Sequence, residues 1–234
     1  MHEERTQSGT VRRGDKPDES TGRPGFDRRM TREEINALPI RRFERTVRVI
    51  RSREEMGEAL ERLRSEKVLG FDTESRPSFK KGESYPPSLI QLAGRRSVYL
   101  FQLRHLKFPR PLREILSSPQ IIKAGAALDD DIRKLKELGP FRAAGFVDLG
   151  TMAREMEIKN HGLRGLSAVL LGFRISKKSQ CSNWARDVLV PAQVGYAAMD
   201  AWVSRELYLH MKKLQKKRKS GNGNNGNLPS RPCP

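Results

Sequence analysis

Cysteine, histidine and long apolar runs are all scarce in this chain of 234 residues. It has two cysteines, Cys181 and Cys233, and four histidines. Because no Cys/His cluster is present, the sequence argues against a disulfide framework and against a zinc site. No apolar run approaches the roughly 18 residues that span a membrane, and the polar N-terminus lacks the apolar core of a signal peptide. We therefore expect a soluble cytoplasmic protein with no membrane contact.

Acidic residues are also in deficit, because 28 Asp and Glu stand against 46 Lys and Arg, for a net charge of +18. Residues 211–234 carry seven basic and no acidic side chains, and residues 31–210 keep a net charge of +10. A basic protein suits a polyanionic partner, because lysine and arginine displace the counterions condensed on a phosphate backbone. Basicity that serves solubility gives the same composition, so charge alone leaves nucleic-acid binding open.

The chain divides into three parts by composition. Residues 1–30 are rich in Gly, Pro, Ser, Arg and Asp without periodicity, which predicts a disordered tail. Residues 213–234 combine lysines with Gly-Asn repeats, which predicts a flexible basic tail. Between them, residues 31–212 are long enough for one domain with a core of its own.

The apolar pattern of the middle part predicts alternating strands and helices. Expected strands cover residues 47–50, 67–73, 88–94, 97–103, 121–125 and 146–148. Expected helices start after the cap Thr31 and cover residues 53–64, 111–116, 128–138, 151–156, 163–171 and 191 to about 214. Three consecutive strands followed by alternating helix and strand indicate an α/β fold with a mixed sheet flanked by helices.

The segment Asp72-Thr73-Glu74 follows directly on the apolar strand-like run Val68-Leu69-Gly70-Phe71. Residues two apart on a strand point to the same face, so both carboxylates can reach one point. Two adjacent carboxylates repel each other, and a shared cation relieves that repulsion. A turn or a helix cap gives the same short pattern, so this segment does not decide the function by itself.

Further acidic residues turn this pair into a constellation. Asp131 ends the triplet Asp129-Asp130-Asp131, where a strand-like run passes into a helix. Tyr196 and Asp200 are four residues apart and therefore share one face of the last helix. Taken singly, acids at a helix start favour the helix dipole, and a tyrosine is an ordinary core residue.

Together these residues resemble the DEDD 3′–5′ exonucleases, in the subgroup with tyrosine in its third motif, which includes ribonuclease D and the exonuclease domain of the Werner syndrome protein. Supporting matches are residues 88–92, 99–101 and 181–184, and residues 69–79 resemble the stand-alone bacterial members. The resemblance covers roughly residues 45–212 and implies a ribonuclease-H-like fold.

The resemblance also implies an activity, the hydrolysis of phosphodiester bonds at the 3′ ends of single-stranded or 3′-ended DNA or RNA to release nucleoside monophosphates. It implies two Mg²⁺ or Mn²⁺ ions about 3.5–4 Å apart, with Asp72, Glu74, Asp131 and Asp200 as their ligands. Tyr196 would orient the attacking water, because a phenol with a pKa of roughly 10 is a poor base at neutral pH.

Substrate contacts are expected from residues near these acids: Arg76, Lys80, Ser88, Leu89, Gln91 and Trp184, with Leu89 wedged against the last base. His161, Arg164 and the loop of Lys177 and Lys178 are expected to flank the groove. Two other functions stay open, a nucleic-acid-binding module with a degenerate site and a ribonuclease-H-like endonuclease. The choice between DNA and RNA depends on contacts with the 2′-hydroxyl, which the sequence does not locate.

Overall fold

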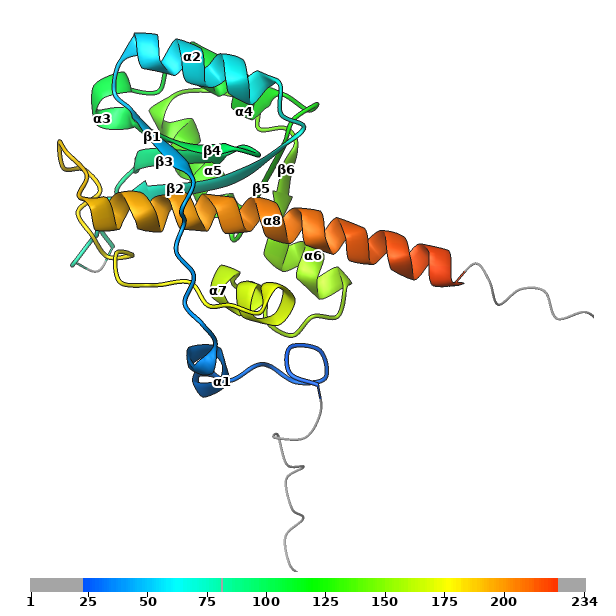
Figure 1. The fold of residues 1–234 in the computed structure, drawn as a ribbon. Coiled ribbons are helices and arrows are strands. Elements are labelled where there is room, and N and C mark those ends of the chain that lie inside the picture. The colour runs from blue at the N-terminus through cyan, green and yellow to red at the C-terminus, as the bar shows by residue number, and fades with distance from the viewer. Residues whose placement is uncertain (1–22, 81, 223–234) are drawn as a thin grey trace, which may run out of the picture.

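The computed structural model describes residues 23–80 and 82–222, which fold around one six-stranded sheet (Figure 1). The strands are β1 (Thr46–Ile50), β2 (Val68–Ser75), β3 (Pro87–Ala93), β4 (Ser97–Gln102), β5 (Ile122–Gly125) and β6 (Phe146–Asp148). Their order across the sheet is β1-β4-β3-β2-β5-β6. β3 runs antiparallel to β2 and β4, and the other neighbouring pairs are parallel. The predicted mixed sheet is therefore confirmed, and β2 lies near its centre.

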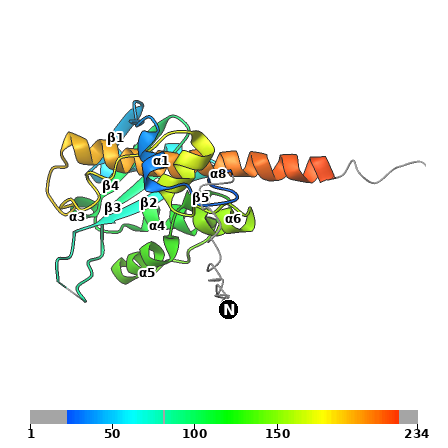
Figure 2. The same ribbon diagram turned by 90° about the horizontal axis from the view of Figure 1, so that it is seen from below.

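Helices cover both faces of the sheet (Figures 1 and 2). One face packs against α2 (Arg53–Arg64), α4 (Arg110–Ser117) and α5 (Leu128–Leu138), and the other against α6 (Leu149–Glu155), α7 (Leu163–Leu166) and α8 (Pro191–Asn222). Two short helices complete the fold, α1 (Arg32–Ala37) and α3 (Leu103–Leu106), with a π-helical segment η1 (Ser167–Leu171). No helix in the described part of the chain is long and apolar enough to cross a membrane.

The central strands are buried on both faces, which explains their nearly continuous apolar sequences. On β2, Leu69 and Phe71 belong to the core under α2, α4 and α5. On β3, Leu89 belongs to the opposite core under α8, while Ile90 and Leu92 belong to the first. The alternation fixes which side chains of β2 meet α8, namely those of the even-numbered residues that include Asp72 and Glu74.

Local signals in the sequence located most elements well. α1 begins at the predicted cap Thr31, which forms a capping box with Glu34, and α2 begins with a second capping box, of Ser52 with Glu55. β2 ends at Ser75 rather than at residue 73, so Glu74 is itself part of the strand. α3 was not predicted, because its four residues continue the apolar run of β4 without a break.

The predicted tails are shorter than expected at both ends. Residues 23–30 were assigned to a disordered tail, yet they pack on the body, where Lys159 N donates to the oxygen of Gly25 at 2.7 Å. α8 continues to Asn222, so residues 213–222 are helical, in keeping with the good helix propensity of lysine, glutamine and arginine. Its last turns project beyond the sheet in both views (Figures 1 and 2). Residues 1–22 and 223–234 lie outside the described residues.

Candidate active site

Strand β2 carries two acids that face helix α8, next to the point where the helix lies closest to the strand. A Cβ atom on Gly70 would lie 1.8 Å from the carbonyl oxygen of Ala201, so only glycine lets α8 approach this near. Asp72 and Glu74 follow on the same face of the strand. The glycine in the apolar run thereby brings both carboxylates next to the helix.

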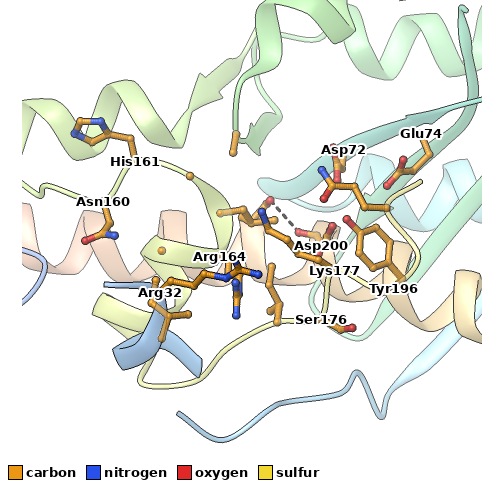
Figure 3. Close-up of a pocket in the computed structure, with 18 of the residues that line it drawn as sticks. Arg32, Asp72, Glu74, Asn160, His161, Arg164, Ser176, Lys177, Tyr196 and Asp200 are labelled. Carbon is orange, nitrogen blue, oxygen red and sulfur yellow. Dashed lines mark hydrogen bonds between the residues drawn. The ribbon is translucent and has the colours of Figure 1, made fainter. Parts of the chain in front are cut away.

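Helix α8 supplies the third acid. One carboxylate oxygen each from Asp72, Glu74 and Asp200 lie within 4.8 Å of one another. Asp200 Oδ1 is shielded from solvent and has no hydrogen-bond partner among the residues the structure describes. Tyr196 lies one turn before Asp200 on α8, so its side chain is directed toward the same cluster. Figure 3 shows these four side chains gathered at one side of a cavity.

Asp131 approaches β2 from α5, but it is not one of the three acids that lie within 4.8 Å of one another and is not among the described residues that line the cavity. Its Oδ1 accepts a hydrogen bond from Thr73 Oγ1 at 2.6 Å, which ties it to the strand between the other two acids. Asp129 and Asp130 point away and are exposed, and Asp130 pairs with Lys134 at 2.7 Å. Of the three consecutive acids, Asp131 is thus the one that turns toward β2, as the sequence motif predicted.

A neighbouring acid, Asp148, holds this corner together from β6. Its carboxylate accepts from Ala127 N at 2.6 Å, just before α5, and from Thr151 N at 2.7 Å, in the first turn of α6. Ala127 itself has φ of 59°, an uncommon conformation for a residue with a side chain. Asp148 therefore caps α6 and also positions the start of α5.

Burial and mutual repulsion make these carboxylates hard to ionise. Burial, and then the charges of Asp200 and Asp131, raise the pKa of Asp72 well above its ordinary value. Burial and the neighbouring acids raise the pKa of Glu74 to about 10. Burial raises the pKa of Asp131 to about 6 and that of Asp200 to about 7, the latter against the hydrogen bond from Tyr196 and the charge of Lys177. A cation would stabilise the ionised cluster.

The donor set fits magnesium or manganese. All the candidate ligands are carboxylate oxygens, the hard ligands that these cations prefer over softer metals. The buried Oδ1 of Asp200 has no hydrogen-bond partner among the described residues, and a cation held by the cluster would supply one. Burial raises the pKa of Tyr196 above its usual value, so this phenol stays protonated and acts as a hydrogen-bond donor rather than as a base.

Three of the side chains predicted to contact substrate, those of Leu89, Trp184 and Gln91, are buried in the structure. Leu89 is fully buried opposite Glu74 and packs under α8, so it does not wedge against a base. Trp184 is 1% exposed and packs on the ring of Tyr196, with the ring centroids 5.9 Å apart. Gln91 is fully buried opposite Asp72, and neither of its amide atoms has a hydrogen-bond partner among the described residues. Leu89 and Gln91 are covered because both faces of β3 are buried, and Trp184 is covered by the ring of Tyr196.

The other predicted contacts lie on the loop after β2 or at its end. Arg76 stacks over the ring of Tyr85 at 4.6 Å, and Lys80 lies 3.9 Å from Glu83. Ser88 is half-buried on β3. None of Arg76, Lys80 and Ser88 is among the described residues that line the cavity.

The cavity itself has a volume of about 940 Å³ and is lined by acids on one side and by basic and polar side chains on the other (Figure 3). His161, Arg164 and Lys177 line it, as expected from the sequence. Arg29 and Arg32 line it as well, and sequence reasoning missed them. Arg29 belongs to the predicted tail and Arg32 to the short helix expected after Thr31, and no local pattern links either of them to acids at positions 72 to 200.

Comparison with solved structures defines the class of protein. The exonuclease domain of Nibbler from Aedes aegypti superposes with a TM-score of 0.69 and 24% identity, covering 78% of this chain and 94% of that one. Ribonuclease D of Escherichia coli superposes with a TM-score of 0.61 and 20% identity, covering 78% of this chain and 52% of that one. The fold is thus the ribonuclease-H-like fold of these exonucleases.

Sequence comparison then gives the family. Residues 47–216 match the 3′–5′ exonuclease family. "Exonuclease 3′-5′ domain-containing protein 2" of Drosophila melanogaster is 36% identical over 146 residues, which are 61% of this chain and 25% of that protein. The chain belongs to the 3′–5′ exonuclease family, and it is a hydrolase. It spans about a quarter of the length of this fly relative.

Proposed function

We propose that the protein is a metal-dependent 3′–5′ exonuclease that removes nucleoside monophosphates one at a time from the 3′ end of a nucleic acid. The observation that supports this best is the convergence of Asp72, Glu74 and Asp200 within 4.8 Å, with one buried oxygen of Asp200 unpaired. An intact set of acids favours an enzyme over a binding module whose site is degenerate.

The position of each acid would determine which metal ion it binds. Asp72, Glu74 and Asp200 would hold one Mg²⁺ or Mn²⁺ ion, while Asp72 and Asp131 would hold a second on the leaving-group side. When bound, a pair of such ions activates water and neutralises the charge that develops on the leaving oxygen. Thr73 keeps Asp131 in place through its 2.6 Å hydrogen bond.

Tyr196 would position the attacking water rather than deprotonate it. Its hydroxyl is protonated at working pH and lies on the side of the cavity that holds the acids, so it can hold a water beside the acid cluster. Trp184 packs against the tyrosine ring and limits its movement. This role for Tyr196 is the basis for assigning the chain to the tyrosine subgroup of the family. Its bacterial origin and its cytoplasmic location stay predictions from the sequence.

A cleavage assay tests the function and identifies the preferred sugar. Matched 5′-labelled single-stranded DNA and RNA are incubated with Mg²⁺, with Mn²⁺ or with EDTA, beside the Asp72→Asn variant and a circular substrate. The expected result is a ladder that shortens from the 3′ end of the linear strands and that disappears with EDTA and in the variant. Cleavage of the circle would instead indicate an endonuclease, and retarded migration without cleavage would indicate a binding module.

A further inference from the structure

The segment of residues 23–38 forms an outer wall of the cavity, on the same side of the sheet as α7 and α8 (Figure 1). It is held against residues 158–175 by hydrogen bonds along its length. Met30 N donates to Asn160 Oδ1 at 2.9 Å, and Arg174 Nε donates to the oxygen of Leu38 at 3.0 Å. The side chain of Ile35, on α1, is buried. The segment is therefore part of the folded body.

Close packing fixes the backbone on either side of the wall's arginines. Gly25 adopts φ of +85°, and a Cβ atom there would lie 2.4 Å from Val169 Cγ2, so the chain touches η1 directly. Arg28 pairs with Glu34 at 2.6 Å, and Glu34 also completes the capping box of α1 with Thr31. Arg29 and Arg32 are thus presented to the cavity from a rigid support.

The cations of this wall are not neutralised by the protein. Arg29 and Arg32 are exposed, and neither forms an ion pair within residues 23–80 and 82–222. Arg164 hydrogen-bonds Asn36 of α1, while its buried Nε has no hydrogen-bond partner in the described part of the chain. Figure 3 shows Arg32 and Arg164 on one side of the cavity and Asp72, Glu74 and Tyr196 on the other. Cationic side chains thus face the acid cluster across an open space.

The two walls require ligands of opposite sign. The acids bind cations, whereas the guanidinium groups of the opposite wall repel free cations and attract phosphate, which they can bind through paired hydrogen bonds. The cavity volume of about 940 Å³ lies near the top of the roughly 300–1,000 Å³ usual for small-molecule sites. It therefore has room for more than the one phosphate that is cleaved.

We propose that Arg29 and Arg32, with Arg164, bind the phosphates of a single strand upstream of its 3′ end. The proposal rests on the proposed function, and it adds that the enzyme prefers oligonucleotides to minimal esters. Residues 23–38 lie before the 47–216 range of the family match, so this wall belongs to the part of the chain outside that match. The salt slope is the decrease of the logarithm of the binding constant with the logarithm of the salt concentration. Each phosphate contact should increase it by about 0.7 for a single strand.

The test compares two double variants with equal loss of charge. Arg29→Gln/Arg32→Gln removes the wall cations, whereas Arg42→Gln/Arg53→Gln removes two exposed arginines that do not line the cavity. Hydrolysis is measured on the p-nitrophenyl ester of thymidine 5′-monophosphate, which carries a single phosphate, and on a single-stranded oligonucleotide of about twelve nucleotides. We expect the wall variant to raise KM for the oligonucleotide about tenfold, with kcat and the ester rates unchanged. The control variant should change KM far less.

Binding without turnover separates this proposal from the proposed function. Fluorescence anisotropy with a labelled oligonucleotide, in Ca²⁺ instead of Mg²⁺, should show a salt slope lower by about 1.4 in the wall variant than in wild type. An equal slope in the wall and control variants would overturn the proposal, as would an equal loss on the ester and the oligonucleotide. If wild type hydrolyses neither substrate, the proposed function fails, while the anisotropy still decides whether the wall binds phosphates.

Discussion

Lys123 on β5 and the acid cluster of β2 and α8 are both buried charges, and the two are built differently. Lys123 is fully buried, yet its ammonium donates to the carbonyl oxygens of Ser118 at 2.7 Å and Ile121 at 2.8 Å and lies 5.2 Å from the ring centre of Phe146. In the acid cluster, like charges face one another and Asp200 Oδ1 has no partner among the described residues.

The difference separates a buried charge whose hydrogen bonds are made within the protein from buried charges that lack a partner. A buried group whose hydrogen bonds are satisfied costs little, whereas an unsatisfied buried group destabilises the protein until a ligand arrives. Lys123 makes its hydrogen bonds to the chain just before β5 and needs no further partner. The acids have high pKa values because the protein alone does not neutralise them, and the missing partner is the cation. The following predictions test that contrast.

The largest effect is expected from Asp200→Asn. The exchange removes one charged ligand, and we expect the rate of exonucleolytic cleavage to fall by about a thousandfold or more. It also relieves repulsion within the cluster, so the free energy of unfolding in EDTA should rise by about 1 kcal/mol. Urea unfolding and the cleavage assay measure the two effects. A variant that is both inactive and less stable would contradict the contrast.

Lys123→Met should have the opposite effects to Asp200→Asn, a loss of stability with activity unchanged. Methionine retains the apolar stem but leaves the carbonyls of Ser118 and Ile121 without their donor, so the free energy of unfolding should fall by about 2 kcal/mol. The kcat of the folded variant should equal that of wild type, because Lys123 does not line the cavity. A large loss of kcat at full folding would assign Lys123 to the active site instead.

Stability should depend on pH with opposite signs at the two places. Burial raises the pKa of Asp200 to about 7, so its folded form keeps a proton that the unfolded form has released. That stabilisation is complete below about pH 4 and is lost as the pH rises toward 7. Burial lowers the pKa of Lys123 to about 8, so stability is instead gained as the pH rises from 8 toward 10.5.

The pH prediction is measured by urea unfolding in EDTA, with each variant as the reference. The stability of wild type relative to Asp200→Asn should decrease between about pH 4 and 7. Its stability relative to Lys123→Met should increase above about pH 8. A flat profile in either comparison would contradict the buried titrating group assigned to that site.

A smaller effect is expected from Gln91→Met. The amide of Gln91 is buried opposite Asp72 without a hydrogen-bond partner in the described residues, so an apolar side chain of similar size should raise the free energy of unfolding by about 1 kcal/mol. Thermal and urea unfolding in EDTA measure this gain. A loss of stability would show that the amide is satisfied in solution and belongs with Lys123 among the structural polar groups.

The smallest effect is expected from deleting residues 215–234. The deletion removes the last turns of α8 with their lysines and the contact of Arg218 with the oxygen of Met156. Because these cations project from the body, they should add only nonspecific, screened attraction, so affinity for oligonucleotides should fall a few-fold at low salt and hardly at high salt. A purely catalytic defect, with unchanged affinity, would contradict this role.

Much of the fold and of the acid cluster follows from local sequence signals. The cap Thr31, the apolar strand before Asp72 and the spacing of Tyr196 and Asp200 each predict a feature that the structure contains. These signals succeed because the physics behind them acts within a few residues.

The misses have a common physical cause, which is that they depend on partners far along the chain. Leu89 and Trp184 have sequence patterns compatible with a half-exposed position, but α8 and the ring of Tyr196 cover them. The arginines at positions 29 and 32 reach the cavity only because Asn160 and Val169 hold their segment in place. No pattern within that segment predicts these contacts.

The most direct test of the central claim is a titration with Mn²⁺ followed by electron paramagnetic resonance, on wild type, Asp200→Asn and Asp129→Asn. Asp129 is an exposed acid two residues from Asp131 and serves as the matched control. If the unsatisfied acids form a cation site, wild type and Asp129→Asn should bind Mn²⁺ alike, and Asp200→Asn should bind it at least about tenfold more weakly. Equal affinity in all three proteins would contradict the assignment of the acid cluster as a metal site.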